Sequence, residues 1–204
     1  MKFEKELMKE RGSAMEIIET AIPEVKIVVP KVFGDARGYF FESWNAGKYA
    51  EAGIDCNWMQ DNESRSKFGV LRGLHYQAAP YTQAKLVRVI EGAVLDVAVD
   101  IRKGSPTFGK HVAVELSAEN KYQFFVPRGF AHGFVVLSEN VTFAYKCDNV
   151  YMPSHERGVA FDDPELGIDW KVGLKEFILS PKDTANPRLK DAELFDYANK
   201  EYLK

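Results

Sequence analysis

The stretch Pro127-Arg-Gly-Phe-Ala-His132 carries the most information about the fold. Pro127 and Gly129 are turn-forming residues, and a tight turn at this point would deliver His132 into the mouth of a barrel. Short segments rich in Val, Phe and Tyr lie on both sides of this turn, separated by Gly, Pro, Asn or Ser. Such spacing is typical of an all-β sandwich or barrel, and the turn before His132 favours a jelly roll among these folds.

The expected strands are short and fill the middle of the chain. Between residues 95 and 101, apolar side chains at the odd positions alternate with Asp96, Ala98 and Asp100, which is the period of two that a half-buried strand requires. Helical patterns are confined to residues 2–11, 46–53 and 191–202. The strands are expected at residues 27–33, 38–44, 83–100, 111–116, 122–126, 133–137 and 141–147.

The composition is that of a folded globular protein. The 204 residues include 46% hydrophobic and 28% charged side chains. We expect one domain over residues 15–204 with a short C-terminal helix, preceded by an N-terminal extension of residues 1–14 that carries no chemistry. Lys and Arg number 27 against 30 Asp and Glu, and this net charge of −3 argues against a nucleic-acid partner.

The chain shows no membrane or export signal. No apolar run approaches the roughly 18 residues of a membrane-spanning helix, and the first residues, MKFEKELMKERGSAM, lack the apolar centre of a signal peptide. Cys56 and Cys147 form neither a CxxC pair nor a disulfide framework. The sequence therefore predicts a cytoplasmic protein with buried thiols and no membrane partner.

Four histidines are the first candidates for chemistry. His75 lies in the stretch Arg72-Gly-Leu-His-Tyr-Gln77 and is either a proton-transfer group or a core histidine with satisfied hydrogen bonds. The same two interpretations apply to His132. We expect His111 and His155 at the surface. Tyr145 lies on an alternating strand that can direct it into the barrel or outward.

Basic residues placed on or near the expected strands form a second candidate group. In an acidic chain, cations within the β core favour an anion site, because guanidinium groups match phosphate oxygens. The alternative for each of them is ordinary surface solvation. The sequence lacks a Gly-rich phosphate loop, so side chains would have to hold a phosphate. These residues are Arg37, Arg65, Arg72, Lys85 and Arg88.

The pattern P-x-G-x-x-H of residues 127–132 resembles the second motif of the cupin superfamily. In metal-binding cupins, the first motif supplies an H-x-H pair and a downstream Glu. Here Gln77 stands two residues after His75, so the pair is missing and too few ligands remain for a metal site. We therefore expect neither a metal nor another cofactor.

Seven motifs in order resemble the dTDP-4-dehydrorhamnose 3,5-epimerase family over residues 16–197. The resemblance implies a metal-free jelly roll of the cupin type that forms homodimers. The motifs are Asp35-Ala-Arg-Gly-Tyr-Phe-Phe-Glu42, Gln60-Asp-Asn-Glu-Ser-Arg-Ser66, Gly69-Val-Leu-Arg-Gly-Leu-His-Tyr-Gln77, Lys85-Leu-Val-Arg88, Pro127-Arg-Gly-Phe-Ala-His-Gly-Phe134, Tyr145-Lys-Cys147 and Leu179-Ser-Pro-Lys-Asp183.

The resemblance also implies a reaction and its catalytic residues. The family inverts carbons 3 and 5 of a dTDP-linked 4-keto-6-deoxyhexose in dTDP-L-rhamnose synthesis, and both carbons lie α to the ketone. By resemblance, His75 is the base and Asp183 orients it. Lys85 faces the ketone oxygen, and Tyr145 returns a proton from the opposite face.

Further residues match the family's substrate contacts. Arg72 and His132 match residues that line the sugar end. Arg37, Phe40 and Glu42 match an element that reaches across the dimer to the nucleotide. Other nucleotide or sugar contacts are implied for Gln60, Asn62, Glu156 and Lys182.

Three other functions are compatible with parts of this pattern. A relative that epimerises only C3 or C5, or that isomerises the keto sugar, can share the same His and Tyr positions. A cupin-like protein that binds a nucleotide sugar without turnover does not need an acid and a base on opposite faces. A metal-dependent cupin oxygenase or isomerase is disfavoured by Gln77.

Overall fold

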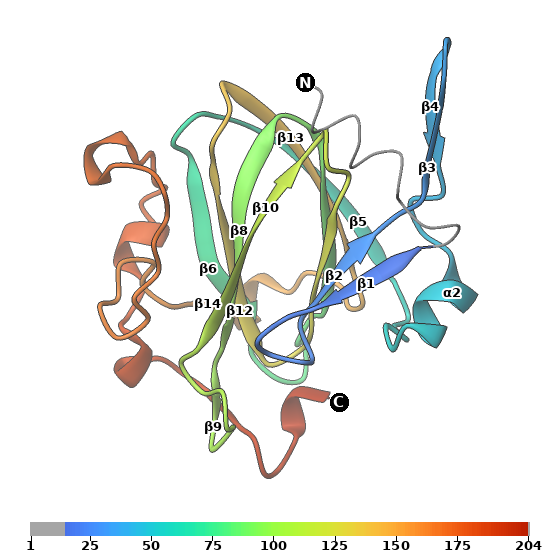
Figure 1. Ribbon diagram of the computed structural model, residues 1–204. Coiled ribbons are helices and arrows are strands. Elements are labelled where there is room, and N and C mark those ends of the chain that lie inside the picture. Colours follow the sequence, from blue (N-terminus) through green and yellow to red (C-terminus); the bar gives the residue numbers. More distant parts are fainter. Residues whose placement is uncertain (1–14, 204) are drawn as a thin grey trace.

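The computed structural model describes residues 15–203, and it consists mainly of two facing antiparallel β-sheets (Figure 1). The six-stranded sheet has the order β1 (Glu16–Glu19), β2 (Lys26–Val29), β11 (Gln123–Val126), β7 (Lys85–Glu91), β13 (Asn140–Cys147) and β5 (Gln60–Lys67). The five-stranded sheet has the order β10 (His111–Ser117), β8 (Ala93–Asp100), β12 (Phe130–Val136), β6 (Leu71–Gln77) and β14 (Glu156–Gly158).

Strands that neighbour each other in these sheets are often distant in sequence. β11 lies between β2 and β7, and β12 lies between β8 and β6. The chain therefore crosses repeatedly from one sheet to the other, as expected for a jelly roll. The predicted all-β, cupin-type fold is confirmed.

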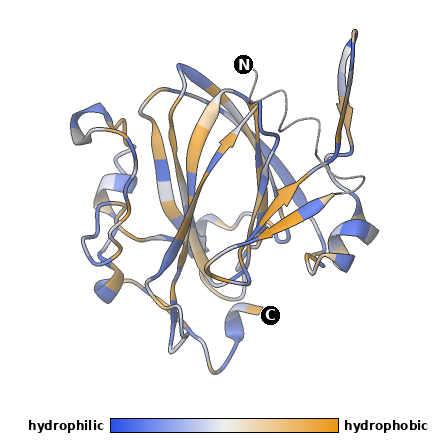
Figure 2. Ribbon diagram, in the orientation of Figure 1, coloured by the Kyte–Doolittle hydropathy of each residue, from blue (hydrophilic) through white to orange (hydrophobic). Residues whose placement is uncertain are grey.

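The interior between the sheets is apolar and dominated by aromatic and β-branched side chains. Phe124, Phe134 and Phe143 are almost fully buried there, and the rings of Phe134 and Phe143 stack with centroids 4.3 Å apart. Figure 2 shows hydrophobic residues concentrated on the strands, whereas the helix at residues 46–51 is mostly hydrophilic. This packing holds the two sheets together and so positions the polar side chains that lie between them.

The outer face of the five-stranded sheet is also buried, which the sequence did not indicate. The alternation in β8 is present, but Leu95, Val97 and Val99 point outward into a second apolar cluster, while Val94 and Ala98 face the interior. Residues 159–202 cover that outer face (Figure 1). The expected half-buried strand is therefore wrong, because the C-terminal segment supplies a second hydrophobic layer.

The C-terminal segment contains no α-helix at the predicted position. Instead it forms the 3-10 turns η4 (Leu189–Asp191) and η5 (Glu201–Leu203) and the strand β15 (Phe195–Asp196), which pairs in parallel with β9 (Arg102–Lys103). Asp196 and Asn199 accept hydrogen bonds from the backbone N–H groups two residues later. Such local side-chain bonds compete with helix formation, so the predicted helix over residues 191–202 is wrong.

The predicted helix near residue 46 is present as α2 (Ala46–Glu51). The side chain of Asn45 caps its first turn by accepting from the N–H of Lys48 at 3.2 Å, and Tyr49 packs against the outer face of the six-stranded sheet. The helix predicted over residues 2–11 lies outside the described residues. The remaining 3-10 turns are η1 (Pro153–His155), η2 (Leu174–Glu176) and η3 (Asp183–Ala185).

A two-stranded hairpin, β3 (Val32–Asp35) and β4 (Gly38–Phe41), stands away from the sandwich (Figure 1). Tyr39 is 60% exposed and Phe40 is 69% exposed, so this hairpin carries aromatic rings that the described chain leaves largely uncovered. The helices of residues 15–203 are all too short to span a membrane.

Candidate active site

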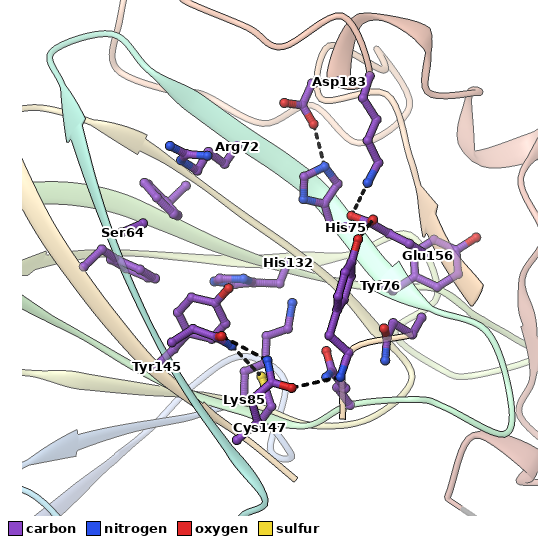
Figure 3. Close-up of a pocket in the computed structure, with 18 of the residues that line it drawn as sticks. Ser64, Arg72, His75, Tyr76, Lys85, His132, Tyr145, Cys147, Glu156 and Asp183 are labelled. Carbon is purple, nitrogen blue, oxygen red and sulfur yellow. Dashed lines mark hydrogen bonds and ion pairs between the residues drawn. The ribbon is translucent and has the colours of Figure 1, made fainter. Parts of the chain in front are cut away.

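One end of the sandwich opens into a cavity of about 450 Å³ between the two sheets. Figure 3 shows polar side chains from both sheets directed into it. His111 and His155 do not line this cavity, and both are half-buried rather than exposed. The predicted residues that line it are Gln60, Asn62, Arg72, His75, Lys85, His132, Tyr145, Glu156, Lys182 and Asp183.

A β-bulge in β6 brings Arg72 and His75 to the same side of the sheet. Residues three apart in a regular strand point to opposite faces. In the register with β12, His75 pairs with His132 and Arg72 pairs with Phe134, so β6 contains one extra residue between the paired positions. Both side chains consequently line the cavity.

Gly73 makes this bulge possible. Its φ of +131° is one that residues with a side chain rarely adopt. A Cβ atom there would lie 2.6 Å from the Cα of Gly133 and 2.8 Å from the carbonyl oxygen of His132. The close approach of β6 to β12 therefore requires glycine at position 73.

His75 is held by a buried carboxylate. Its Nε2 lies 2.5 Å from Oδ1 of Asp183, whose side chain is 4% exposed. Oδ2 of Asp183 accepts from the hydroxyl of Ser180 at 2.7 Å. Because an ionised carboxylate only accepts, Nε2 carries the hydrogen, and the other ring nitrogen is on the cavity side in Figure 3.

The pKa of Asp183 reflects two opposing effects. Burial raises it, but the hydrogen bonds from His75 and Ser180 outweigh burial and hold the pKa below its ordinary value. Asp183 is therefore an anion at neutral pH. In this state it fixes the orientation of the imidazole and stabilises the imidazolium that forms when His75 accepts a proton.

His132 has a carboxylate partner that sequence reasoning did not assign. Its Nε2 lies 2.8 Å from Oδ1 of Asp96, which is fully buried on β8. Burial raises the pKa of Asp96, while the charge and hydrogen bond of His132 oppose that shift. In the sequence, Asp96 stands out as an acidic residue within an alternating apolar strand. Its partner His132 follows only from the strand order, which places β12 beside β8.

Lys85 and Tyr145 come from the sheet opposite to His75. Lys85 is on β7 and Tyr145 on β13, and Nζ of Lys85 lies 5.9 Å from the centre of the Tyr145 ring. Burial raises the pKa of Tyr145, so the phenol keeps its proton near neutrality. Burial lowers the pKa of Lys85, and nearby acidic groups, including Asp96, oppose this shift.

The rim of the cavity is a network of paired side chains. Glu156 forms an ion pair with Lys182, and its Oε2 accepts from the hydroxyl of Tyr151 at 2.5 Å. On the other side, Nε2 of Gln60 donates to Oδ1 of Asn62 at 2.9 Å. Tyr151, Ser180 and Cys147 also line the cavity, and they were not among the predicted site residues.

Arg37, Phe40 and Glu42 are not part of this cavity. Arg37 is on the exposed hairpin with its guanidinium paired to Asp35. The carboxylate of Glu42 accepts from Lys48 and Asn45 beside helix α2. One chain alone therefore does not bring these predicted nucleotide contacts to the site.

Gln77, which takes the place of a second histidine, braces two loops. Its amide nitrogen donates to the carbonyl oxygens of Tyr81 and Val150, and its oxygen accepts from the N–H of Met152 at 2.7 Å. Within residues 15–203, no three His, Cys, Asp or Glu side chains are grouped to hold a metal ion.

The arrangement is suited to proton transfer at a carbon atom. A carboxylate-supported imidazole stands on one wall, and a protonated phenol with an amine stands on the other. A ligand between these walls would meet a base on one face, an acid on the opposite face and a cation beside them.

Comparisons with known proteins identify relatives of this chain. A family model of dTDP-4-dehydrorhamnose 3,5-epimerase matches residues 19–191. The chain is 53% identical to the dTDP-4-dehydrorhamnose 3,5-epimerase of Shigella flexneri over 182 residues, which are 89% of this chain and 99% of that one.

The similar solved structures include both a 3,5-epimerase and a monoepimerase. The 3,5-epimerase of Legionella pneumophila in complex with dTDP-4-keto-L-rhamnose has 54% identity and a TM-score of 0.87, covering 90% of this chain and 98% of that one. A 3'-monoepimerase from Streptomyces bikiniensis in complex with dTDP-quinovose has 34% identity and a TM-score of 0.83, with coverages of 91% and 99%.

Proposed function

The chain belongs to the dTDP-4-dehydrorhamnose 3,5-epimerase family, and from this membership we propose how its cavity carries out the reaction. The enzyme is an isomerase that converts dTDP-4-dehydro-6-deoxy-D-glucose to dTDP-4-dehydro-L-rhamnose. The protons on C3 and C5 are acidic only because the C4 ketone can accept the electrons as an enolate. Catalysis therefore needs a base, a partner for the enolate oxygen and an acid on the other face.

His75 acts as the base. Its cavity-side nitrogen removes the α proton, while Asp183 holds the ring and stabilises the positive charge that develops. Ser180 in turn fixes Asp183 through the second carboxylate oxygen. The bulge at Gly73 directs both His75 and Arg72 into the cavity. We place Arg72 and His132 at the sugar end of the substrate.

Lys85 stabilises the enolate and Tyr145 supplies the proton. Burial makes the Lys85 ammonium costly without a negative partner, and the enolate oxygen provides that partner in the transition state. Tyr145 keeps its phenolic proton because burial raises its pKa. The observation that carries the proposal is that His75 and Tyr145 enter the cavity from opposite sheets.

The nucleotide is held at the rim and by a second copy of the chain. We place Gln60, Asn62, Glu156 and Lys182 against the nucleotide or sugar, as their positions at the cavity allow. The nucleotide contacts of Arg37, Phe40 and Glu42 require a homodimer, in which the hairpin of one protomer completes the cavity of its partner. The exposed rings of the hairpin support this arrangement, and the free thiols Cys56 and Cys147 are compatible with a cytoplasmic enzyme.

Three single variants test the assignment of the base, the acid and the enolate partner. His75→Ala should lower both solvent exchange and epimerisation by about 10²–10⁴-fold, because enolate formation loses its base. Tyr145→Phe should still exchange the α protons with solvent but fail to complete the inversion. Lys85→Ala should depress both processes together by roughly 10²–10³-fold.

The measurement is deuterium uptake compared with product stereochemistry for the three variants and the parent. If Tyr145→Phe inverted both centres at the parent rate, Tyr145 would be a packing residue and the acid would have to be another group. If His75→Ala still exchanged the α protons at the parent rate, His75 could not be the base.

A complementation experiment tests the dimer. Arg37→Ala damages the cavity of the partner, whereas His75→Ala damages the cavity of its own chain. In a mixed dimer one of the two cavities would be intact, so an equal mixture should recover about a quarter of the parent activity after subunit exchange. A fully active monomer, or no recovery from a mixture shown to contain mixed dimers, would contradict the proposal.

A further inference from the structure

Asp96 is a buried acidic residue that has no role in the proposed reaction. It is fully buried on β8, on the same face as the apolar residues Val94 and Ala98. Its Oδ1 is bonded to Nε2 of His132, but its Oδ2 is buried and has no hydrogen-bond partner among the described residues. An unpartnered buried oxygen on an ionisable group is destabilising and therefore calls for an explanation.

The strand order places this acid beside the catalytic row. In the five-stranded sheet, β12 lies between β8 and β6, and His132 is directly opposite His75 in the register. Each histidine is hydrogen-bonded to a different carboxylate: His75 to Asp183, and His132 to Asp96. Lys85 faces this row from the other sheet (Figure 3).

The other ionisable groups around Lys85 are neutral or already paired. Burial raises the pKa of the Cys147 thiol to about 11, and the Tyr145 phenol is also held protonated. The carboxylate of Glu156 is committed to the ion pair and the hydroxyl on the rim. That of Asp183 is bonded to both His75 and Ser180.

Among these described carboxylates, Asp96 is therefore the one with an oxygen that lacks a hydrogen-bond partner, and that oxygen is buried in the interior between the sheets. We propose that Asp96 is a positioning residue whose negative charge keeps the Lys85 ammonium protonated in the closed cavity, while its bond to His132 fixes that ring beside the sugar. A charge several ångströms away is sufficient in a poorly solvated interior, so no direct ion pair is needed. This inference rests on the proposed function, in which Lys85 stabilises the enolate.

The critical variant is Asp96→Asn, which keeps the shape of the side chain and removes its charge. Lys85 should then lose its proton more easily, so the alkaline limb of the kcat–pH profile should move to lower pH by about one unit. KM should change less than kcat, because the lost interaction is strongest in the transition state. Asp100→Asn is the matched control, since Asp100 is equally buried on β8 but is paired with Arg102 outside the cavity.

A double variant separates action through Lys85 from a general structural defect. In a Lys85→Met background, Asp96→Asn should cause little further loss of kcat, because the group on which it acts is already absent. The inference is wrong if Asp96→Asn leaves the alkaline limb in place. It is also wrong if Asp96→Asn lowers kcat by the same factor in the Lys85→Met background as in the parent. If Lys85→Met itself works at the parent rate, the proposed role of Lys85 fails, and the inference fails with it.

A second measurement does not depend on a stable Asp96 variant. Protonation of the Asp96 carboxyl can be followed by carbon NMR in the parent and in Lys85→Met, which removes a charge without removing bulk. If the two groups stabilise each other's charge, Asp96 should take up its proton at higher pH in Lys85→Met than in the parent. An unchanged titration would overturn the inference even if Asp96→Asn does not fold.

Discussion

Replacing Gly73 with alanine should damage both the fold and the site. The structure gives two separate costs for the added methyl group. The φ of +131° is unfavourable for alanine, at about 1–3 kcal/mol. The new Cβ would also lie 2.6 Å from the Cα of Gly133 and 2.8 Å from the carbonyl oxygen of His132. Both are backbone atoms in the neighbouring strand, so relieving the contact costs roughly a further 1–3 kcal/mol.

The free energy of unfolding of Gly73→Ala should therefore fall by about 2–6 kcal/mol, measured by urea denaturation. Gly38→Ala is the matched control, because Gly38 has nearly the same φ of +135° but a Cβ there would meet nothing within 4 Å. The free energy of unfolding of the control should fall only by the part that comes from the unfavourable φ. The comparison isolates the contact between β6 and β12.

Activity should fall as well, because the bulge directs His75 and Arg72 into the same cavity. A displacement of about 1 Å in a catalytic group can reduce the rate about 10²-fold. We expect a loss of this order in kcat, measured under conditions where the variant is still folded. Parent-like kcat together with the unfolding free energy of the Gly38→Ala control would refute the structural role assigned to Gly73.

Three further outcomes follow from the site. Asp183→Asn should lower kcat by about 10²–10⁴-fold with a smaller change in KM, measured by steady-state kinetics; a parent-like kcat would contradict the dyad. Because the pKa of Asp183 is lowered in the folded chain, its stabilising effect is complete above the unfolded value of about 3.9 and is lost as the pH falls through the folded value. In urea denaturation, the difference in unfolding free energy between the parent and Asp183→Asn should therefore narrow as the pH falls below about 3.9, and a difference that widens in that range would be inconsistent with this linkage. Activity should survive dialysis against EDTA, because Gln77 replaces a metal ligand and is used to brace two loops; loss of activity restored by one divalent ion would overturn this expectation.

Local signals in the sequence were sufficient for the fold class. The turn at residues 127–132, the alternation around Asp96 and the short segments rich in Val, Phe and Tyr are properties of neighbouring residues, and they predict strands and turns directly. The burial of both faces of β8 depends instead on residues 159–202, which are distant in sequence. Alternation along one strand carries no information about such a covering layer.

The C-terminal segment shows the limit of helical periodicity. Its buried residues Leu189, Phe195 and Tyr202 lie on the turn η4, the strand β15 and the turn η5, and they pack in the apolar cluster on the outer sheet face instead of forming one side of a helix. The side chains of Asp196 and Asn199 accept hydrogen bonds from backbone N–H groups two residues later, and these local bonds stabilise the non-helical backbone. Tertiary packing and side-chain bonds to the backbone therefore override a pattern that is otherwise compatible with a helix.

The candidate site was accessible from the sequence only through ordered motifs. These motifs identified His75, Lys85, Tyr145 and Asp183, and the structure places all of them around one cavity. The pairing of Asp96 with His132 depends on strand order. The shared face of Arg72 and His75 depends on a register shift between β6 and β12, which cannot be read from either strand alone.

The location of deuterium in the product tests the central claim most directly. The parent enzyme would be incubated with dTDP-4-keto-6-deoxyglucose in deuterated water, and the product would be examined by NMR for label and configuration. The two-sided cavity predicts solvent deuterium at both C3 and C5 of an inverted, L-configured sugar. Label and inversion at only one of these carbons would contradict the 3,5-epimerase assignment and indicate a single-centre epimerase instead.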